Sequence, residues 1–260
     1  MKFVVSDLDG TLLHSHNIVS EYTIRTIDKL VKKNVNFAIA TGRGQQGVQG
    51  ILKQLGINPY LICNNGANIY TPEGECILDK RIPKKIVTEI LKEIRKNNLF
   101  YSAFLNEFYF HSKDELVEDF TSRPLFTEVA VEKEEDIPDL NKIIVSDDNP
   151  KVLIELVNIL KNKFSHLAEI MLSQPTCIDI APKNCTKGTG IENLARIFNL
   201  TPDDFMAFGD GENDLDMLKT VGHPVIMENS QELLKDFFSN VTLSNKEDGV
   251  ARYLEKFFNL

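Results

Sequence analysis

Short apolar runs alternate with longer segments of helical periodicity between residues 2 and 63. In the segment 20–34, apolar side chains recur at the spacing that gathers them on one face of a helix, at Ile24, Ile27, Leu30 and Val31. The pattern predicts three strands and two intervening helices: strands 2–6, 35–41 and 59–63 and helices 20–34 and 44–56. Short strands separated by helices are typical of βαβ units, so we expect a parallel sheet covered on both faces.

The pattern changes in the middle of the chain and then returns. Residues 67–80 predict a hairpin, and the following segment mixes helices, paired strands and an acidic run at 131–138 that we expect to be a loop. Strands and helices alternate again from residue 186 to the end. We therefore expect an α/β fold: a Rossmann-like, doubly wound parallel-sheet core from residues 1–82 and 187–260, with an inserted α+β cap domain at 83–186.

Composition narrows the class of protein. The 260 residues carry 38 acidic and 29 basic side chains, a net charge of −9, which argues against binding to nucleic acid or an anionic membrane. No apolar run reaches the roughly 18 residues of a membrane helix, and the first residues do not resemble a signal peptide. The four cysteines form no CxxC pair, so we expect a reduced, cytoplasmic protein. We also expect a monomer or a weak homodimer.

Polar, glycine-containing stretches follow the predicted core strands. They read SDLDGT at 6–11, ATGR at 40–43, NNGA at 64–67 and GDGEND at 209–214. Each stretch alone is compatible with an ordinary turn, because Asp-Gly and Asn-Gly favour turns. Ligands of open α/β sheets bind at the carboxyl ends of the strands. Because all four stretches are expected at such ends, they indicate one common site.

The predicted site concentrates negative charge. It would gather four carboxylates, those of Asp7, Asp9, Asp210 and Asp214. A like-charge pair at about 4 Å costs about 4 kcal/mol even at an effective dielectric constant of 20. Such a cluster requires a cation, and oxygen ligands favour Mg²⁺, which commonly binds substrate phosphates. Phosphate donors are available in the hydroxyl of Thr41, the backbone N–H of Gly42 and the ammonium group of Lys187.

These stretches resemble a known family. DLDGTLL, ATGR, KGTG at 187–190 and GDGENDLDML follow the order and spacing of the four motifs of the haloacid dehalogenase-like superfamily. The chain is most similar to its Cof-type subfamily IIB, which includes sugar-phosphate phosphatases. The position of the insertion, between ATGR and KGTG, resembles a cap of type C2B.

The resemblance implies a role for each matching residue. Asp7 would be the nucleophile that forms an aspartyl phosphate, and Asp9 would be the general acid and base, for which we expect crowding by Asp7 and partial burial to keep a proton on Asp9. The implied metal ligands are the Asp7 carboxylate, the Asp9 carbonyl and Asp210. Asp214 and Arg43 would have supporting roles, and Arg43 is equally compatible with a structural ion pair. The implied phosphate-binding groups are Leu8, Thr41, Gly42, Lys187 and Asn213.

We therefore expect a Mg²⁺-dependent phosphatase, a phosphoric monoester hydrolase that acts on small phosphorylated metabolites such as sugar phosphates. Two alternatives remain open at this stage. One is a phosphomutase of phosphomannomutase type, and the other is a non-enzymatic phospho-receiver switch. The sequence does not indicate which metabolite fits.

Overall fold

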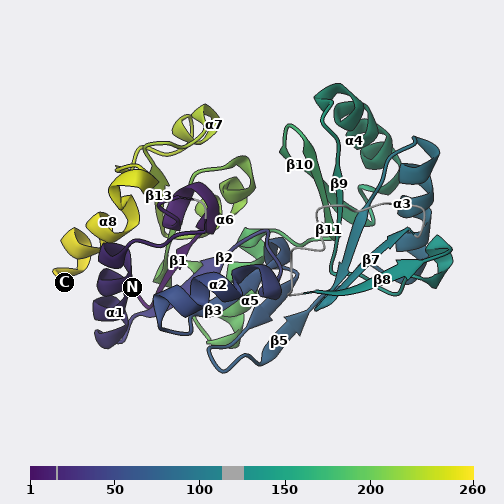
Figure 1. The fold of residues 1–260 in the computed structure, drawn as a ribbon. Coiled ribbons are helices and arrows are strands. Elements are labelled where there is room, and N and C mark those ends of the chain that lie inside the picture. Colours follow the sequence, from purple (N-terminus) through teal and green to yellow (C-terminus); the bar gives the residue numbers. More distant parts are fainter. Residues whose placement is uncertain (16, 113–125) are drawn as a thin grey trace. The chain divides into compact units, whose positions relative to one another are not determined.

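The computed structural model describes residues 1–15, 17–112 and 126–260, and the chain folds as two compact units (Figure 1). The first unit is built from both ends of the sequence, Met1–Leu78 and Thr186–Leu260. The second unit is continuous and comprises Asp79–Cys185. That the second unit acts as a cap stays a prediction.

The second unit starts at Asp79, earlier than the residue 83 expected from the sequence. Two contacts tie this segment to the rest of the unit. Asn141 Nδ2 donates a hydrogen bond to Asp79 Oδ1 at 2.8 Å, and Ile82 forms a β-bridge with Leu140. The boundary therefore precedes the helix whose periodicity marked the change in the sequence.

One sheet organises the first unit, in the order β14-β13-β12-β1-β2-β3-β4-β5. Neighbouring strands from β14 to β3 are parallel, and β4 runs antiparallel to β3. The strands are β1 (Phe3–Ser6), β2 (Asn36–Ala40), β3 (Tyr60–Cys63), β4 (Asn68–Tyr70), β5 (Cys76–Asp79), β12 (Phe205–Gly209), β13 (His223–Met227) and β14 (Val241–Thr242). The expected parallel sheet is present, and the predicted hairpin forms its antiparallel edge.

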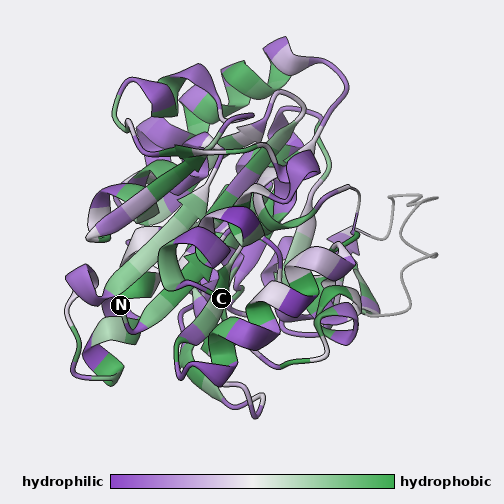
Figure 2. Cartoon of the chain, turned by 90° about the vertical axis from the view of Figure 1, so that its left-hand side faces the viewer, coloured by the Kyte–Doolittle hydropathy of each residue, from purple (hydrophilic) through white to green (hydrophobic). Residues whose placement is uncertain are grey.

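Alternate side chains of β1 point into different cores. Val4 packs into the core that includes α1, α2 and α8, whereas Phe3 and Val5 pack into the core that includes α5 and α6. The helices are α1 (Glu21–Lys32), α2 (Gln45–Leu55), α5 (Lys187–Ile197), α6 (Leu215–Thr220), α7 (Glu232–Lys235) and α8 (Gly249–Phe258). Figure 2 shows hydrophobic colour concentrated on the central strands and mixed colour on the helices. The sheet is therefore covered on both faces, as the doubly wound fold requires.

The second unit has a sheet of order β10-β11-β9-β6-β7-β8. Its strands are β6 (Ser102–Leu105), β7 (Phe108–Ser112), β8 (Thr127–Val131), β9 (Lys142–Ser146), β10 (Ala168–Gln174) and β11 (Cys177–Pro182). The helices α3 (Lys84–Lys96) and α4 (Pro150–Phe164) pack their buried apolar side chains into one core with this sheet. This mixture of helices and mostly antiparallel strands is the expected α+β insertion.

Three local features differ from the sequence prediction. Strand β8 and helix α7 were not predicted. The acidic run at 131–138 was expected to be a loop; its first residue, Val131, ends β8, and Glu134–Asp136 form one turn of 3-10 helix. Glu135 of this turn pairs with Lys92 of α3. Among the described residues, no helix combines the length and apolar character needed to cross a membrane.

Candidate active site

The chain makes a wide turn immediately after β1. Leu12 N–H donates to Asp7 O at 3.2 Å and Leu13 N–H donates to Leu8 O at 2.9 Å, so both hydrogen bonds span five residues. Gly10 has a φ of +85°, which L side chains rarely adopt, and a Cβ at this position would overlap the Asp210 carboxylate. Gly10 therefore lies where the chain changes direction after β1.

Asp7 lies at the base of this turn, buried, with its backbone N–H bonded to Phe208 O of β12 at 3.0 Å. Its Oδ1 accepts a hydrogen bond from Lys187 Nζ at 2.7 Å. Burial raises the pKa of the Asp7 carboxyl, the neighbouring carboxylates of Asp214 and Asp210 raise it further, and Lys187 opposes both effects. The arrangement brings a carboxylate and a cation into contact in a site largely closed to solvent.

Lys187 is the first residue of α5 and is 1% exposed. Besides Asp7, its Nζ donates to Asp214 Oδ1 at 2.6 Å. Burial alone would lower the pKa of the Lys187 ammonium group, but the carboxylates of Asp214 and Asp7 raise it above its ordinary value. Lys187 is therefore a fixed positive charge between the loop after β1, which carries Asp7, and the loop after β12, which carries Asp214.

Asp214 organises the loop after β12. Its Oδ2 accepts the backbone N–H groups of Asp210 and Gly211, both at 3.0 Å, while its Oδ1 accepts from Lys187. A Cβ on Gly209 would lie 2.6 Å from Asp214 Cβ, so only glycine fits where the loop leaves the strand. Both carboxylate oxygens are thus engaged in holding the loop and the lysine.

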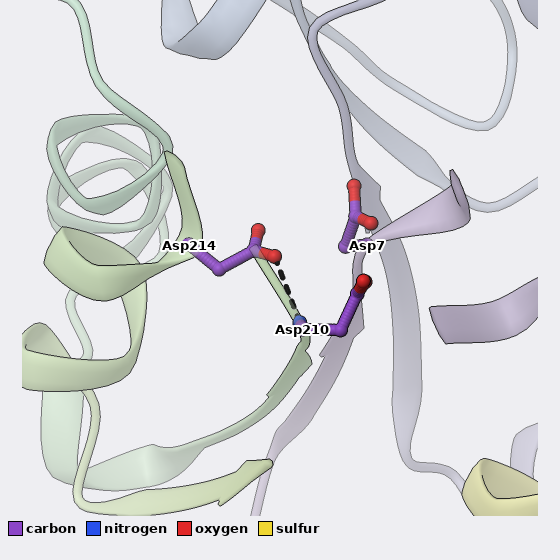
Figure 3. A group of neighbouring side chains, drawn as sticks. All are labelled: Asp7, Asp210 and Asp214. Atoms are coloured by element: carbon purple, nitrogen blue, oxygen red, sulfur yellow. Dashed lines mark hydrogen bonds between the residues drawn. The ribbon is translucent and has the colours of Figure 1, made fainter. Parts of the chain in front are cut away.

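Asp210 completes a group of three carboxylates (Figure 3). One oxygen from each of Asp7, Asp210 and Asp214 lies within 4.8 Å of the others. Thr11 Oγ1 donates to Asp210 Oδ1 at 2.6 Å. Burial raises the pKa of Asp210 to about 6, and Asp214 contributes to the rise while the Thr11 hydrogen bond opposes it. Sequence reasoning assigned Thr11 no role, although it lies within the DLDGT motif.

Asp9 differs from this buried group in its exposure to solvent. Its side chain is 57% exposed and accepts two hydrogen bonds from Arg43, from Nε at 2.8 Å and from Nη2 at 2.5 Å. Arg43 Nη1 also donates to Asn17 Oδ1 at 2.7 Å. The expected partial burial of Asp9 is therefore wrong: the peptide at Gly10 turns away and leaves this side chain at the rim of the site. Arg43 thus forms an ion pair with Asp9, and its supporting role at the site stays a prediction.

The remaining predicted residues lie at neighbouring strand ends. Thr41 is buried at the end of β2, where its N–H donates to Ile62 O at 2.8 Å, its Oγ1 accepts from Arg43 N–H at 3.1 Å, and Gly42 follows it. Leu8 is buried in the turn that carries Asp7, and Asn213 is half-buried in the short turn Glu212–Asp214. The structure records direct contacts among Asp7, Lys187, Asp210 and Asp214, and separately between Asp9 and Arg43.

The sequence model of the haloacid dehalogenase-like hydrolases matches residues 4–254 of the chain. Because the match spans nearly the whole sequence, the chain belongs to this family, and within it to the Cof type. It is an enzyme, a phosphatase, which sets aside the non-enzymatic receiver switch.

Individual relatives share the full length of the chain. An HMP-PP phosphatase of Yersinia pseudotuberculosis is 30% identical over 254 residues, covering 95% of this chain and 92% of its own. A crystal structure from Thermotoga maritima is 30% identical with a TM-score of 0.84 and covers 98% of this chain and 97% of its own. A haloacid dehalogenase-like hydrolase from Bacteroides thetaiotaomicron shares the fold, with a TM-score of 0.86 at 24% identity and 99% coverage of both chains.

Proposed function

We propose that this phosphatase is Mg²⁺-dependent, that it hydrolyses small phosphorylated metabolites such as sugar phosphates, and that it acts through an aspartyl phosphate on Asp7. The observation that carries the proposal is the buried contact of Asp7 with Lys187, beside the carboxylates of Asp210 and Asp214. A carboxylate nucleophile next to a fixed cation suits attack on a phosphate ester, whose oxygens the cation attracts.

The donor set fits Mg²⁺. Asp7 and Asp210 offer carboxylate oxygens at one edge of the sheet, and Asp9 offers a backbone carbonyl in the turn between them. Asp214 is better suited to support these ligands than to bind, because Lys187 and two backbone N–H groups already occupy its oxygens. When bound, the ion would neutralise the clustered carboxylates and polarise a phosphate oxygen.

Lys187 would hold the phosphate against the nucleophile. An ammonium group has three donors, and Asp7 and Asp214 take two of them, which leaves one for a phosphate oxygen. We assign the other phosphate contacts to Thr41, Gly42, Leu8 and Asn213, which lie at the ends of β1, β2 and β12 or just beyond them. In the first step an Asp7 oxygen forms a bond to phosphorus and the bond from phosphorus to the leaving alcohol breaks.

Asp9, after taking up a proton from solvent, would pass it to the leaving alcohol. It would then accept a proton from the water whose oxygen bonds to phosphorus while the bond from phosphorus to Asp7 breaks. It must first leave its ion pair, since Arg43 occupies both of its oxygens. More than half of the Asp9 side-chain surface is exposed to solvent. We therefore assign Arg43 the role of holding Asp9 before the substrate binds.

We propose the cytoplasm as the location, supported by four cysteines that form no disulfide, Cys63, Cys76, Cys177 and Cys185. The partner that we propose for the site is a small phosphorylated metabolite. The second unit, Asp79–Cys185, is proposed to act as the cap that selects the leaving group.

The test is a phosphate-release screen over sugar phosphates, pyridoxal phosphate and nucleotides, with Mg²⁺ and with a chelator. We expect release only with the metal, and loss of kcat by at least about 1,000-fold in Asp7→Asn. Asp28→Asn is the matched control, because Asp28 is a partly exposed carboxylate of α1 paired with Lys32. Transfer of the phosphoryl group to a second sugar, without free phosphate, would identify a mutase. Full activity of Asp7→Asn would refute the proposal.

A further inference from the structure

Two asparagines are bonded to the backbone of the turn that carries Asp7. Asn229, just after β13, donates from Nδ2 to Gly10 O at 2.8 Å. Its Oδ1 accepts the backbone N–H of Asn245 at 2.9 Å, and Asn245 Nδ2 donates to Leu13 O at 2.8 Å. These three hydrogen bonds thus connect Gly10, in the middle of the turn, with Leu13, which follows the turn.

The same segment is bonded to the loop that carries Asp210. Gln231 N–H donates to Asp210 O at 2.9 Å, and Ser230 Oγ donates to Gly209 O at 3.4 Å. Residues 229–231 therefore contact both of the loops whose carboxylates form the buried group. A shift of this segment would change the distance between the two loops.

The chemistry at position 229 requires a side-chain amide. Asn229 acts as donor to a carbonyl oxygen and as acceptor from an N–H group at once. A carboxylate of the same shape could accept but could not donate to Gly10 O. The turn needs such support because Gly10, with no side chain, restricts the backbone least at the point where the chain reverses.

We propose that Asn229 and Asn245 are positioning residues: they fix the nucleophile turn relative to the Asp210 loop and thereby set the rate of the chemical step. The catalytic part of this inference rests on the proposed phosphatase mechanism. A reacting group displaced by a fraction of an ångström loses much of its effect on rate, whereas the binding of substrate to the rest of the site is unchanged. Loss of either amide should therefore lower kcat more than it changes KM.

The chain offers a matched control in Asn240. Its Nδ2 donates to Pro224 O at 3.0 Å and to the Tyr253 hydroxyl at 2.9 Å, so it also links a backbone carbonyl to another segment. None of these contacts involves the nucleophile turn. Asn240→Ala thus removes bonds of the same kind from the same C-terminal part of the chain.

The experiment compares the wild type with Asn229→Ala, Asn245→Ala, the double variant, Asn229→Asp and Asn240→Ala. Hydrogen exchange reports on the amides of Leu12 and Leu13, which close the turn, and steady-state kinetics give kcat and KM. We expect exchange at these two amides to be about tenfold faster and kcat to fall by about tenfold in each single variant at position 229 or 245, with KM changed less than about twofold. The double variant should lose less than the product of the single losses, because the two residues act in one chain of hydrogen bonds.

Asn240→Ala should leave both the exchange of the turn and kcat at the wild-type values. Unchanged exchange in Asn229→Ala would overturn the inference, and so would faster exchange with unchanged kcat. Asn229→Asp with wild-type values would also overturn it, because this variant lacks the donor. If the wild type hydrolyses no ester, the proposed function fails, while the exchange measurement still tests whether the asparagines hold the turn.

Discussion

Gly10 meets two constraints at once in the turn that carries Asp7. Its φ of +85° disfavours any L side chain, and a Cβ there would overlap the Asp210 carboxylate. The first constraint concerns the free energy of folding, because the backbone is strained. The second concerns the site, because relief of the overlap must move a proposed metal ligand.

Gly74 allows the two effects to be separated. It has a φ of +86°, but no atom lies within 4 Å of the Cβ position. We expect Gly10→Ala and Gly74→Ala each to lose about 1–2 kcal/mol of unfolding free energy from backbone strain. Only Gly10→Ala should also lower kcat, by at least about tenfold, as measured by denaturant unfolding and phosphate release. Equal kcat in the two variants would contradict the role given to the Asp210 contact.

The direction of the Asp9 side chain could not be predicted from the sequence. The spacing of Asp7 and Asp9 predicts that both lie near the end of β1, and they do. The direction of the Asp9 side chain depends on the backbone angles around Gly10 and on Arg43, which is 34 residues away in sequence. Spacing arguments carry no information on such angles, so the expected burial of Asp9 failed.

Helix α5 delivers Lys187 to the buried carboxylates. Its N-cap, Thr186, accepts the N–H of Thr189 at 3.1 Å and donates its hydroxyl hydrogen to Asp216. Because Lys187 is the next residue, the cap fixes the position of the Lys187 backbone, from which the side chain extends to Asp7. A helix start is thus part of the site geometry.

Ser20 provides the comparison for this cap. It is the N-cap of α1, accepts the N–H of Thr23 at 3.0 Å and donates to Asp248 Oδ1 at 2.5 Å. Thr186→Ala and Ser20→Ala should each lower the unfolding free energy by about 1 kcal/mol. Only Thr186→Ala should also lower kcat several-fold. If both variants keep the wild-type kcat, the cap stabilises the helix without positioning Lys187.

The elements of the core could be predicted better than their contacts. Parallel strands end at a common edge, so the motifs after β1, β2 and β12 were expected to meet there. The hydrogen-bond partners of the motif residues could not be predicted from the sequence in this way. Thr11 bonds to Asp210 across 199 positions and Asn229 bonds to Gly10 across 219, and no local periodicity reports on pairings of that kind.

At the scale of the whole molecule, the buried carboxylates link stability to pH. In the metal-free protein burial raises the pKa of Asp210 to about 6 and also raises the pKa of Asp7. A carboxyl whose pKa is higher in the folded state binds more protons when folded, so its contribution to stability is present at low pH and is lost as pH rises through the folded pKa. The carboxyls of Glu93 and Glu255 have lowered pKa values, so their contribution changes only in the acid range.

We therefore expect the unfolding temperature of the metal-free protein to fall between about pH 5 and about pH 8, and Mg²⁺ to raise it most at the upper end, where the carboxylates are ionised. Thermal unfolding with a chelator and with Mg²⁺ measures both trends. The double variant Asp7→Asn, Asp210→Asn should show a weaker dependence on pH and little response to the metal. A Mg²⁺ effect that is larger at about pH 5 than at about pH 8 would contradict this assignment.

Because the first unit is built from two separate segments of the sequence, its sheet cannot be completed early in translation. Strand β1 leaves the ribosome well before its neighbour β12, which is some 200 residues later in the chain. At about 5–20 residues per second, one edge of β1 waits on the order of 10–40 s for its partner. The second unit is continuous, so it can collapse during that interval. The group of Asp7, Lys187 and Asp210 can form only after Lys187 and Asp210 have emerged. A nascent chain that stops before Lys187 would carry Asp7 without the ammonium group that contacts it.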